Sequence, residues 1–223
     1  MVIIILGITV GTYTIGIIFQ WLIGGELQKI FGRRKLQKQI ADLKNHFIIC
    51  GFGSIGHIIC KELFEDSIKF VVIEQDSAVI EELISLKYLC LEMDATSEDA
   101  LLAGGIMNAR GLVTAVNSDA NNVFITLTAK GLNPNLFIIA RAGRIGSEKK
   151  LLQAGANHVV SPHQIGGYRM AQALLRPNVT EFIDFATHDP DSGMNMEEIP
   201  VRANSQFSDI SLVDSGIRQQ FDL

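Results

Sequence analysis

Residues 47–56 read FIICGFGSIG, and they contain the clearest indication of the fold. The apolar run Phe47–Cys50 is typical of a short buried strand, and it leads directly into the glycine pattern GxGxxG. An amphipathic helical pattern follows over Ile55–Glu65, and an acidic residue, Glu74, ends the next apolar run. A strand, this loop, a helix and an acid about 20 residues further on together indicate a nucleotide-binding βαβ unit.

Each glycine of this loop has a task if a phosphate binds there. Gly51 permits a tight turn, Gly53 lets the backbone approach a pyrophosphate, and Gly56 lets helix and strand pack closely. Phosphate oxygens would accept hydrogen bonds from the unpaired N–H groups at the start of the helix. Glu74 would accept hydrogen bonds from an adenosine ribose and would repel a 2′-phosphate, so we expect NAD(H) or an adenine nucleotide rather than NADP. The alternative is a glycine-rich turn that binds no ligand.

Beyond this unit, short apolar runs alternate with amphipathic helical patterns. Such alternation predicts an α/β fold with a doubly wound parallel sheet and right-handed crossovers. The expected strands are Phe47–Cys50, Phe70–Ile73, Tyr88–Leu91, Leu112–Val116, Leu136–Ala140 and His158–Val160. The expected helices are Ile55–Glu65, Ala78–Leu86, Asp99–Leu102, Ala120–Lys130, Ser147–Ala154 and Gln164–Leu175.

An uncharged segment opens the chain, from Val2 to Gly25. As a helix it would be roughly 36 Å long, enough to cross the hydrocarbon core of a bilayer. A secretory signal peptide would carry its positive charges before the apolar run, whereas here they follow it. We therefore expect one transmembrane helix. Its internal glycines leave two interpretations open, close packing against another helix and a hinge.

The charge distribution places this helix in a membrane and the rest of the chain on the cytoplasmic side. Residues 26–46 carry six Lys or Arg and two acidic side chains, while the whole chain has a net charge of −5. A basic collar beside an apolar segment satisfies the positive-inside rule and favours contact with anionic lipid. Because the body that follows is acidic, we exclude nucleic acid as a partner.

No catalytic apparatus is predicted. None of the three tyrosines begins a Tyr-x-x-x-Lys pair, no segment is left for a substrate domain, and the five histidines lack the spacing of metal ligands. The three cysteines, Cys50, Cys60 and Cys90, also lack metal spacing and are expected to be reduced core residues. We therefore expect a binding protein rather than an enzyme, with no catalytic residue and no metal site.

Six strings of the chain resemble one known family, the RCK (regulator of potassium conductance) domain, also called the TrkA N-terminal domain. The strings are Asn45–Gly56, Val72–Asp76, Met93–Thr96, Ala115–Asn122, Ile138–Ala142 and Ala154–Pro162. The upstream segment is similar to the inner pore helix and linker of two-helix prokaryotic potassium channels. The resemblance implies a homotetrameric channel whose RCK domains form a cytoplasmic gating ring, with potassium ions passing through a pore that this sequence does not contain.

The resemblance also implies a set of ligand-binding residues. They are Gly51, Phe52, Gly53, Ser54, Ile55, Gly56, Glu74, Asp94, Ala95, Thr96, Val116, Asn117 and Arg141. Ser54 departs from the family, which often has Arg or another long side chain at this position. Arg141 and Gly143 stand where the calcium-gated branch has acids, so we expect no calcium site there and expect Arg141 to bind a phosphate in bidentate fashion.

These inferences divide the chain into four parts. Residues 1–25 are expected to be an inner pore helix, 26–45 a basic linker, 46–185 the nucleotide-binding RCK domain, and 186–223 the start of a truncated C-terminal lobe. In the family, the helix Gln164–Leu175 crosses over to a neighbouring subunit; ordinary packing within the domain is the alternative. The expected function is a ligand-gated potassium channel subunit of the cell inner membrane. A regulatory subunit of a potassium uptake transporter and a membrane-tethered NAD-dependent oxidoreductase are the alternatives.

Overall fold

The structure is a computed structural model that describes residue 7, residues 10–14, residue 36, residues 38–179 and residues 205, 210 and 211. The expected membrane helix, the first part of the linker and the expected C-terminal lobe lie almost wholly outside these residues. No helix among the described residues is long and apolar enough to cross a membrane. The chain divides into two compact units, Met1–Ile165 and Gly166–Leu223.

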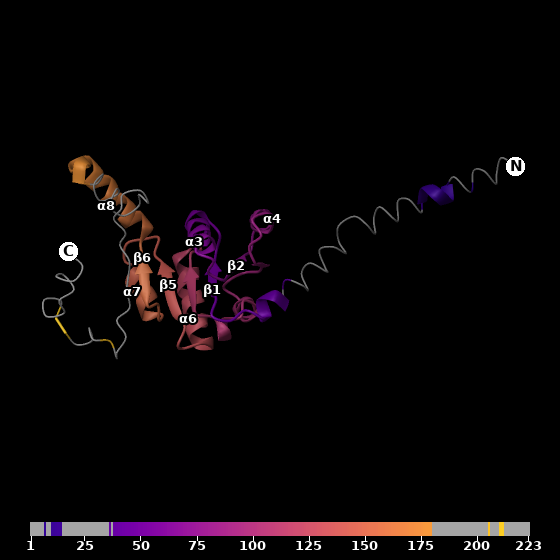
Figure 1. The fold of residues 1–223 in the computed structure, drawn as a ribbon, viewed down its shortest axis with the longest axis horizontal. Helices are drawn as coiled ribbons and strands as arrows, with labels where there is room; N and C mark the ends of the chain where they lie inside the picture. The colour runs from indigo at the N-terminus through magenta and orange to yellow at the C-terminus, as the bar shows by residue number, and fades with distance from the viewer. Residues whose placement is uncertain are drawn as a thin grey trace. The chain divides into compact units, whose positions relative to one another are not determined.

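The first unit contains one parallel six-stranded sheet with the order β3-β2-β1-β4-β5-β6 (Figure 1). The strands are β1 Phe47–Cys50, β2 Phe70–Glu74, β3 Cys90–Glu92, β4 Gly111–Thr114, β5 Phe137–Arg141 and β6 His158–Val160. Strand β1 lies at the centre and pairs with β2 on one side and β4 on the other. The chain therefore winds outward in both directions from β1, which confirms the predicted doubly wound parallel sheet.

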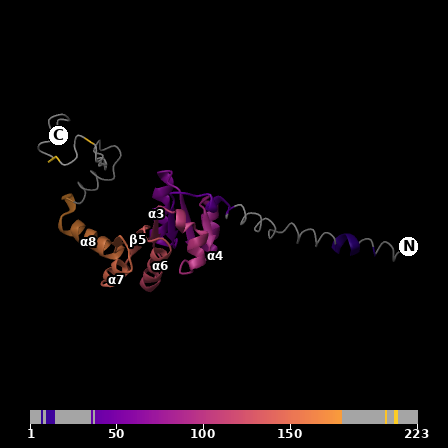
Figure 2. The same cartoon turned by 90° about the horizontal axis from the view of Figure 1, so that it is seen from below.

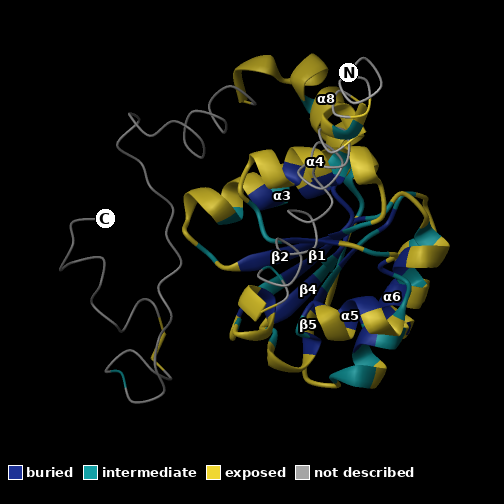
Figure 3. Cartoon of the chain, turned by 90° about the vertical axis from the view of Figure 1, so that its right-hand side faces the viewer, coloured by how far each residue is buried: buried dark blue, intermediate teal, exposed yellow. Residues whose placement is uncertain are grey.

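Helices cover both faces of this sheet. They are α3 Ser54–Glu65, α4 Ser77–Ser85, α5 Glu98–Ala103, α6 Asp119–Leu132 and α7 Ser147–Gln153, with a short 3₁₀ helix, η1, at Ile106–Asn108. Helices α3 and α4 lie on one face, and α5 and α6 on the other (Figure 3). Helix α7 packs beside α6 (Figure 2).

The side chains of β1 alternate between two cores because successive residues of a strand point to opposite faces. Ile48 and Cys50 belong to the larger core, which is completed by α5, α6 and α7, and Ile49 belongs to the smaller core beneath α3 and α4. All three residues are fully buried. Strands buried on both faces require the near-continuous apolar runs that the sequence contains.

The end of the expected linker also joins the larger core. Ile40 is fully buried there, and Leu36 and Leu43 pack against the same cluster. The neighbouring His46 is buried as well, with its Nε2 atom 2.8 Å from the carbonyl oxygen of Gly104. The residues just before β1 are therefore anchored to the domain.

Two further expectations concern the cysteines and the last helix. All three cysteines are buried and free, as predicted, and burial raises the pKa of Cys50 and of Cys60 to about 12. Helix α8 spans Pro162–Leu175, so it begins two residues before the expected Gln164 and has proline in its first turn, a position that proline favours. None of its residues is buried.

Candidate nucleotide-binding site

The glycine loop joins β1 to α3, and two of its glycines are required by the backbone. Gly51 has φ +94°, and a Cβ atom there would lie 3.0 Å from Val116 Cγ1. A Cβ atom on Gly56 would overlap the carbonyl oxygen of Gly51. Gly51 therefore makes the turn and Gly56 permits the close packing of helix on strand, in the roles that the sequence pattern predicts.

Gly53 is different, because nothing in the protein requires glycine there. Its backbone is extended, with φ −71° and ψ −167°, a conformation open to any residue. A Cβ atom there would meet only Asn117 Oδ1, at the ordinary contact distance of 3.9 Å. The space over Gly53 is thus left open by the protein, in the place where a pyrophosphate would approach the backbone.

The start of α3 lies directly beneath this open space. Gly53 is its N-cap residue, and no side chain caps the helix. Helices α4 and α6, by contrast, are capped by Asp76 and Ser118. The first turn of α3 also contains no acidic residue, so the partial positive charge of its N–H groups is not neutralised there. This helix start can receive an anion.

A cavity of about 280 Å³ opens beside the loop at the carboxyl ends of the strands. It lies where the chain winds in opposite directions from β1 and β4, which is where ligands bind in open parallel sheets. Its volume is near the lower end of the range for ligand pockets. The lining residues are Gly51, Gly53, Ile73, Glu74, Gln75, Met93, Asp94, Ala95, Thr96, Ala115, Val116, Asn117, Ser118, Asn121 and Ile125.

Glu74, the last residue of β2, is held in place by three backbone N–H groups. Its Oε2 atom accepts a hydrogen bond of 2.8 Å from the amide of Phe52, in the glycine loop. Its Oε1 atom accepts from the amides of Gln75, at 2.7 Å, and Asp76, at 3.1 Å. The carboxylate is therefore fixed against the loop, and its remaining lone pairs can accept a hydrogen bond from a hydroxyl group.

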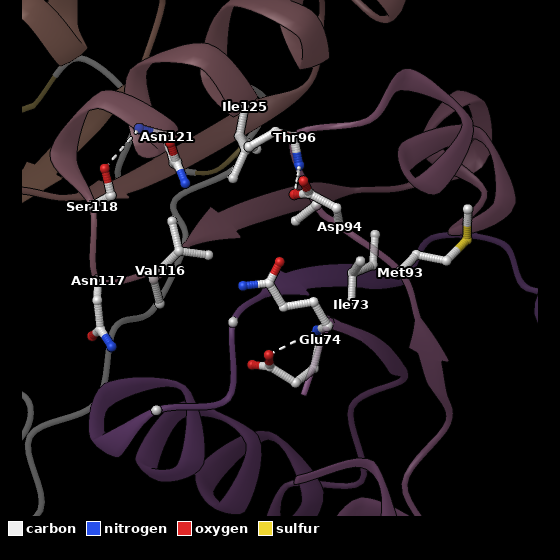
Figure 4. A pocket seen from close by; sticks show the side chains of 15 residues that line it. Ile73, Glu74, Met93, Asp94, Thr96, Val116, Asn117, Ser118, Asn121 and Ile125 are labelled. Atoms are coloured by element: carbon white, nitrogen blue, oxygen red, sulfur yellow. Dashed lines mark hydrogen bonds between the residues drawn. The ribbon is translucent and has the colours of Figure 1, made fainter. Parts of the chain in front are cut away.

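Asp94 and its neighbours line the end of the cavity beyond β3, across from Asn117 and Ser118 (Figure 4). The Oδ1 atom of Asp94 accepts a hydrogen bond of 2.9 Å from the amide of Thr96. This bond fixes the turn after β3, and the second carboxylate oxygen can accept from a ligand amine or hydroxyl.

Arg141, at the end of β5, does not line the cavity. Its Nη1 atom donates to Asn117 Oδ1, at 3.1 Å, and more weakly to the carbonyl oxygen of Val116, at 3.4 Å. The guanidinium therefore contacts Asn117, which lines the cavity, and the expected bidentate contact between Arg141 and a phosphate stays a prediction.

Eight of the thirteen predicted residues line the cavity: Gly51, Gly53, Glu74, Asp94, Ala95, Thr96, Val116 and Asn117. Five do not: Phe52, Ser54, Ile55, Gly56 and Arg141. Phe52 buries its ring in the smaller core and contributes its amide to Glu74. Ser54 and Ile55 form the first turn of α3. These residues shape the loop, whereas the eight others face the space beside it.

Sequence reasoning missed seven lining residues: Ile73, Gln75, Met93, Ala115, Ser118, Asn121 and Ile125. Most of them flank predicted residues at strand ends, so the rule that parallel strands end at one edge could have found them. Ser118 has a local signal as well, because it caps α6 by accepting from the amide of Asn121 at 3.3 Å.

Two polar residues of α6 support the site and were also missed. Asn122 is fully buried, and its Nδ2 atom donates to the carbonyl oxygens of Val116 and Arg141, both at 3.0 Å. Asp119 accepts hydrogen bonds from the amides of Gly143 and Arg144 and from the hydroxyl of Ser147.

Burial alone would raise the pKa of Asp119. The hydrogen bonds from Ser147, Gly143 and Arg144, together with the charge of Arg144, outweigh burial and leave this pKa below its usual value. The ionised carboxylate thus ties the loop after β5 to the start of α6. Among the described residues, no group of three or more His, Cys, Asp or Glu side chains could hold a metal ion.

Comparison with known proteins identifies a family and several relatives. The sequence profile of the TrkA-N domain matches residues 47–162. The chain is 38% identical over 216 residues to "Potassium channel protein 1" of Methanocaldococcus jannaschii, a match that covers 96% of this chain. The chain spans 64% of the length of that relative.

Solved structures give the same result. The GsuK channel bound to NAD is 26% identical, with a TM-score of 0.55, over 65% of this chain and 25% of that one. GsuK bound to ADP is 26% identical, with a TM-score of 0.54, over 70% of this chain and 43% of that one. The family resemblance drawn from the six sequence strings is thereby confirmed. The chain belongs to the TrkA-N domain family, in which the RCK domains are included.

Proposed function

We propose that this chain is the nucleotide-binding regulatory part of a potassium channel subunit, and that NAD(H) or an adenine nucleotide binding beside the glycine loop controls potassium conductance. The observation that carries the proposal is the open space over Gly53, at the uncapped start of α3. Glycine there has no structural reason within the protein, whereas a pyrophosphate that approaches the backbone requires it.

The residues around this space fit such a ligand. The N–H groups of the first turn of α3 would hold the phosphates, and Glu74 would accept from the ribose hydroxyls. Asp94 and Thr96 would meet the base at the far end of the cavity. Because a carboxylate at the ribose position repels a 2′-phosphate, NADPH should bind more weakly than NADH.

The comparisons support a channel rather than an enzyme. A protein named as a potassium channel shares 38% identity over 96% of this chain, and GsuK is a channel solved with NAD and with ADP. The extent of this match also favours a channel over a separate regulator of an uptake transporter, because it continues upstream of the domain into the apolar N-terminal segment.

In the proposed subunit, residues 1–25 form the inner pore helix in the cell membrane and residues 26–45 the linker in contact with lipid headgroups. Residues 46–185 form the regulatory domain and residues 186–223 begin a second lobe. Four subunits would assemble around the pore and form a cytoplasmic ring. A ligand can drive opening or closing only by binding one state more tightly than the other, so the ring must present different sites in the two states.

Isothermal titration of the purified 223-residue chain in detergent tests the binding step. NADH, NAD⁺, AMP, ADP, ATP and NADPH are titrated in turn. We expect saturable one-site binding of NADH or an adenine nucleotide and weaker binding of NADPH. If none of the six ligands binds, or if NADPH binds most tightly, the proposed site is wrong.

A further inference from the structure

The cavity that would hold a phosphate-bearing ligand carries the wrong side-chain charge for one. Two of its described lining residues are ionisable, Glu74 and Asp94, and both are acidic. No Lys, Arg or His is among the described residues that line it. Apart from the start of α3, the positive potential for a phosphate must therefore come from a side chain set back from the wall.

Arg141 is such a side chain. Its guanidinium donates to two neutral oxygens, Asn117 Oδ1 and the carbonyl oxygen of Val116. Among the described residues, no carboxylate forms an ion pair with it, and its Nε atom is buried without a hydrogen-bond partner. The positive charge of Arg141 is thus not neutralised by the protein around it.

Asn117 stands between this charge and the glycine loop. Its Oδ1 atom accepts from Arg141, and the same atom is the nearest neighbour of a Cβ atom built on Gly53, at 3.9 Å. Because the amide oxygen is engaged by Arg141, the Nδ2 group is left as the donor of this side chain. Polarisation by a guanidinium makes that donor stronger.

A buried residue of α6 supports the backbone around Asn117 and Arg141. Asn122, fully buried on α6, donates one hydrogen bond to the carbonyl oxygen of Val116 and one to that of Arg141. These two bonds tie the segment that follows β4 to the end of β5. The backbone beside Asn117 and at Arg141 is therefore held in place without a ligand.

We propose that Asn117 binds the ligand's phosphate through its Nδ2 group, and that Arg141 is a positioning residue that acts through Asn117 by orienting and polarising its amide. The inference rests on the proposed nucleotide site and deepens it. It assigns Arg141 an indirect role in place of the expected bidentate contact with phosphate.

The test compares ligands that share a base and ribose but differ in phosphate. ADP and adenosine are titrated against the full chain and against the variants Asn117→Ala, Asn117→Asp, Arg141→Met and the double variant Asn117→Ala/Arg141→Met. Calorimetry measures ADP, and ligand-observed NMR measures the weaker adenosine. Arg110→Met is the matched control, because Arg110 precedes β4 at the opposite edge of the sheet, with its guanidinium over the ring of Phe47.

We expect each of the three single variants at positions 117 and 141 to weaken ADP binding about tenfold or more and to change adenosine binding less than twofold. The double variant should lose no more than about twofold beyond Asn117→Ala alone, because both substitutions remove one shared contact. Asn117→Asp is decisive, since a carboxylate keeps the partner of Arg141 but removes the donor. Arg110→Met should bind both ligands as the parent chain does.

Three results would overturn the inference: equal losses for ADP and adenosine, additive losses in the double variant, or undiminished ADP binding by Asn117→Asp. The first would show that the residues only support the fold, and the second that Arg141 meets the ligand independently. Failure of the parent chain to bind ADP or NADH at all is a different result, which rejects the proposed function itself.

Discussion

Replacing Gly53 by alanine should impair ligand binding while leaving folding almost unchanged. The substitution adds one methyl group in the space over the loop. The backbone there is compatible with alanine, and the added atom would be 3.9 Å from its nearest neighbour. The protein itself therefore has no clash to relieve.

The expected effect on folding is small because two contributions oppose each other. Restricting the unfolded chain by replacing glycine with alanine stabilises by about 0.4–1 kcal/mol. Alanine at an N-cap position is less favourable than glycine by a similar amount. The net change should lie within about 1 kcal/mol, which corresponds to a shift in Tm of roughly 4 °C or less for a chain of this size.

The expected effect on binding is large. The methyl group would hold the phosphate away from the N–H groups at the start of α3. Losing one hydrogen bond to a charged group costs about 1.5–3 kcal/mol, which corresponds to a loss of affinity of roughly 10- to 150-fold. Gly53→Asp should abolish binding, because it adds a negative charge at the same place.

Calorimetry with NADH and ADP measures the affinity, and thermal unfolding without ligand measures the stability. Gly131→Ala is the matched control, because Gly131 is exposed on α6 with no atom within 4 Å of an added Cβ. This control should bind as the parent does and melt at a higher temperature. A Gly53→Ala variant that folds normally and binds either ligand with the parent's affinity would refute the assignment of the phosphate to this loop.

Three further predictions concern the stability of the fold and the link between ligand binding and channel opening. Gly56→Ala should lower Tm strongly or prevent folding, because its Cβ atom would overlap the carbonyl oxygen of Gly51; an unchanged melting curve would contradict this. Asp119→Asn should destabilise the chain by about 1–3 kcal/mol at neutral pH. Because the pKa of Asp119 is lowered in the folded state, the parent should be more stable than Asp119→Asn at every pH above the ordinary Asp pKa of about 3.9. This difference in the free energy of unfolding should shrink as the pH falls through the folded-state pKa. Urea unfolding measures it, and a difference that stays constant across pH would contradict the prediction. A flexible Gly/Ser insertion after Gly32 lies upstream of the core residue Ile40, so it should leave ligand affinity intact. It should remove the ligand dependence of channel opening. If single-channel recording still shows this dependence, the linker does not transmit ligand binding to the pore.

The sheet could be predicted from the sequence because its strands are apolar runs between clear boundaries. The strand Phe47–Cys50 was predicted with its observed bounds, since His46 precedes it and Gly51 ends it. The strand His158–Val160 was also correct at both ends. In such segments local sequence and tertiary packing favour the same structure, so the pattern suffices.

The predicted strand bounds were wrong where an apolar residue packs in the core without belonging to a strand. The third strand was expected at Tyr88–Leu91 but is observed at Cys90–Glu92. Tyr88 instead packs its ring against Phe52, Phe64 and Phe70, and its amide donates to the carbonyl oxygen of Leu83 at the end of α4. A tertiary aromatic cluster of this kind leaves no periodic signal in the sequence.

Part of the site could also be predicted from the sequence. The loop glycines and Glu74 follow from spacing, because strand, loop and helix occur in a fixed order. The contact between Arg141 and Asn117 does not, since it joins residues 24 positions apart across two strands. Only the structure shows that Arg141 contacts Asn117 without lining the cavity itself.

In the proposed subunit, a nucleotide bound at the glycine loop controls a potassium pore. Single-channel recording of the full-length subunit, with NADH or ADP applied to the cytoplasmic face, tests it most directly, with Gly53→Ala recorded beside the parent. We expect open probability to change with ligand concentration in the parent and not in Gly53→Ala, while both channels conduct potassium. A ligand response that is the same in both channels, or a parent channel that ignores every nucleotide it binds, would contradict it.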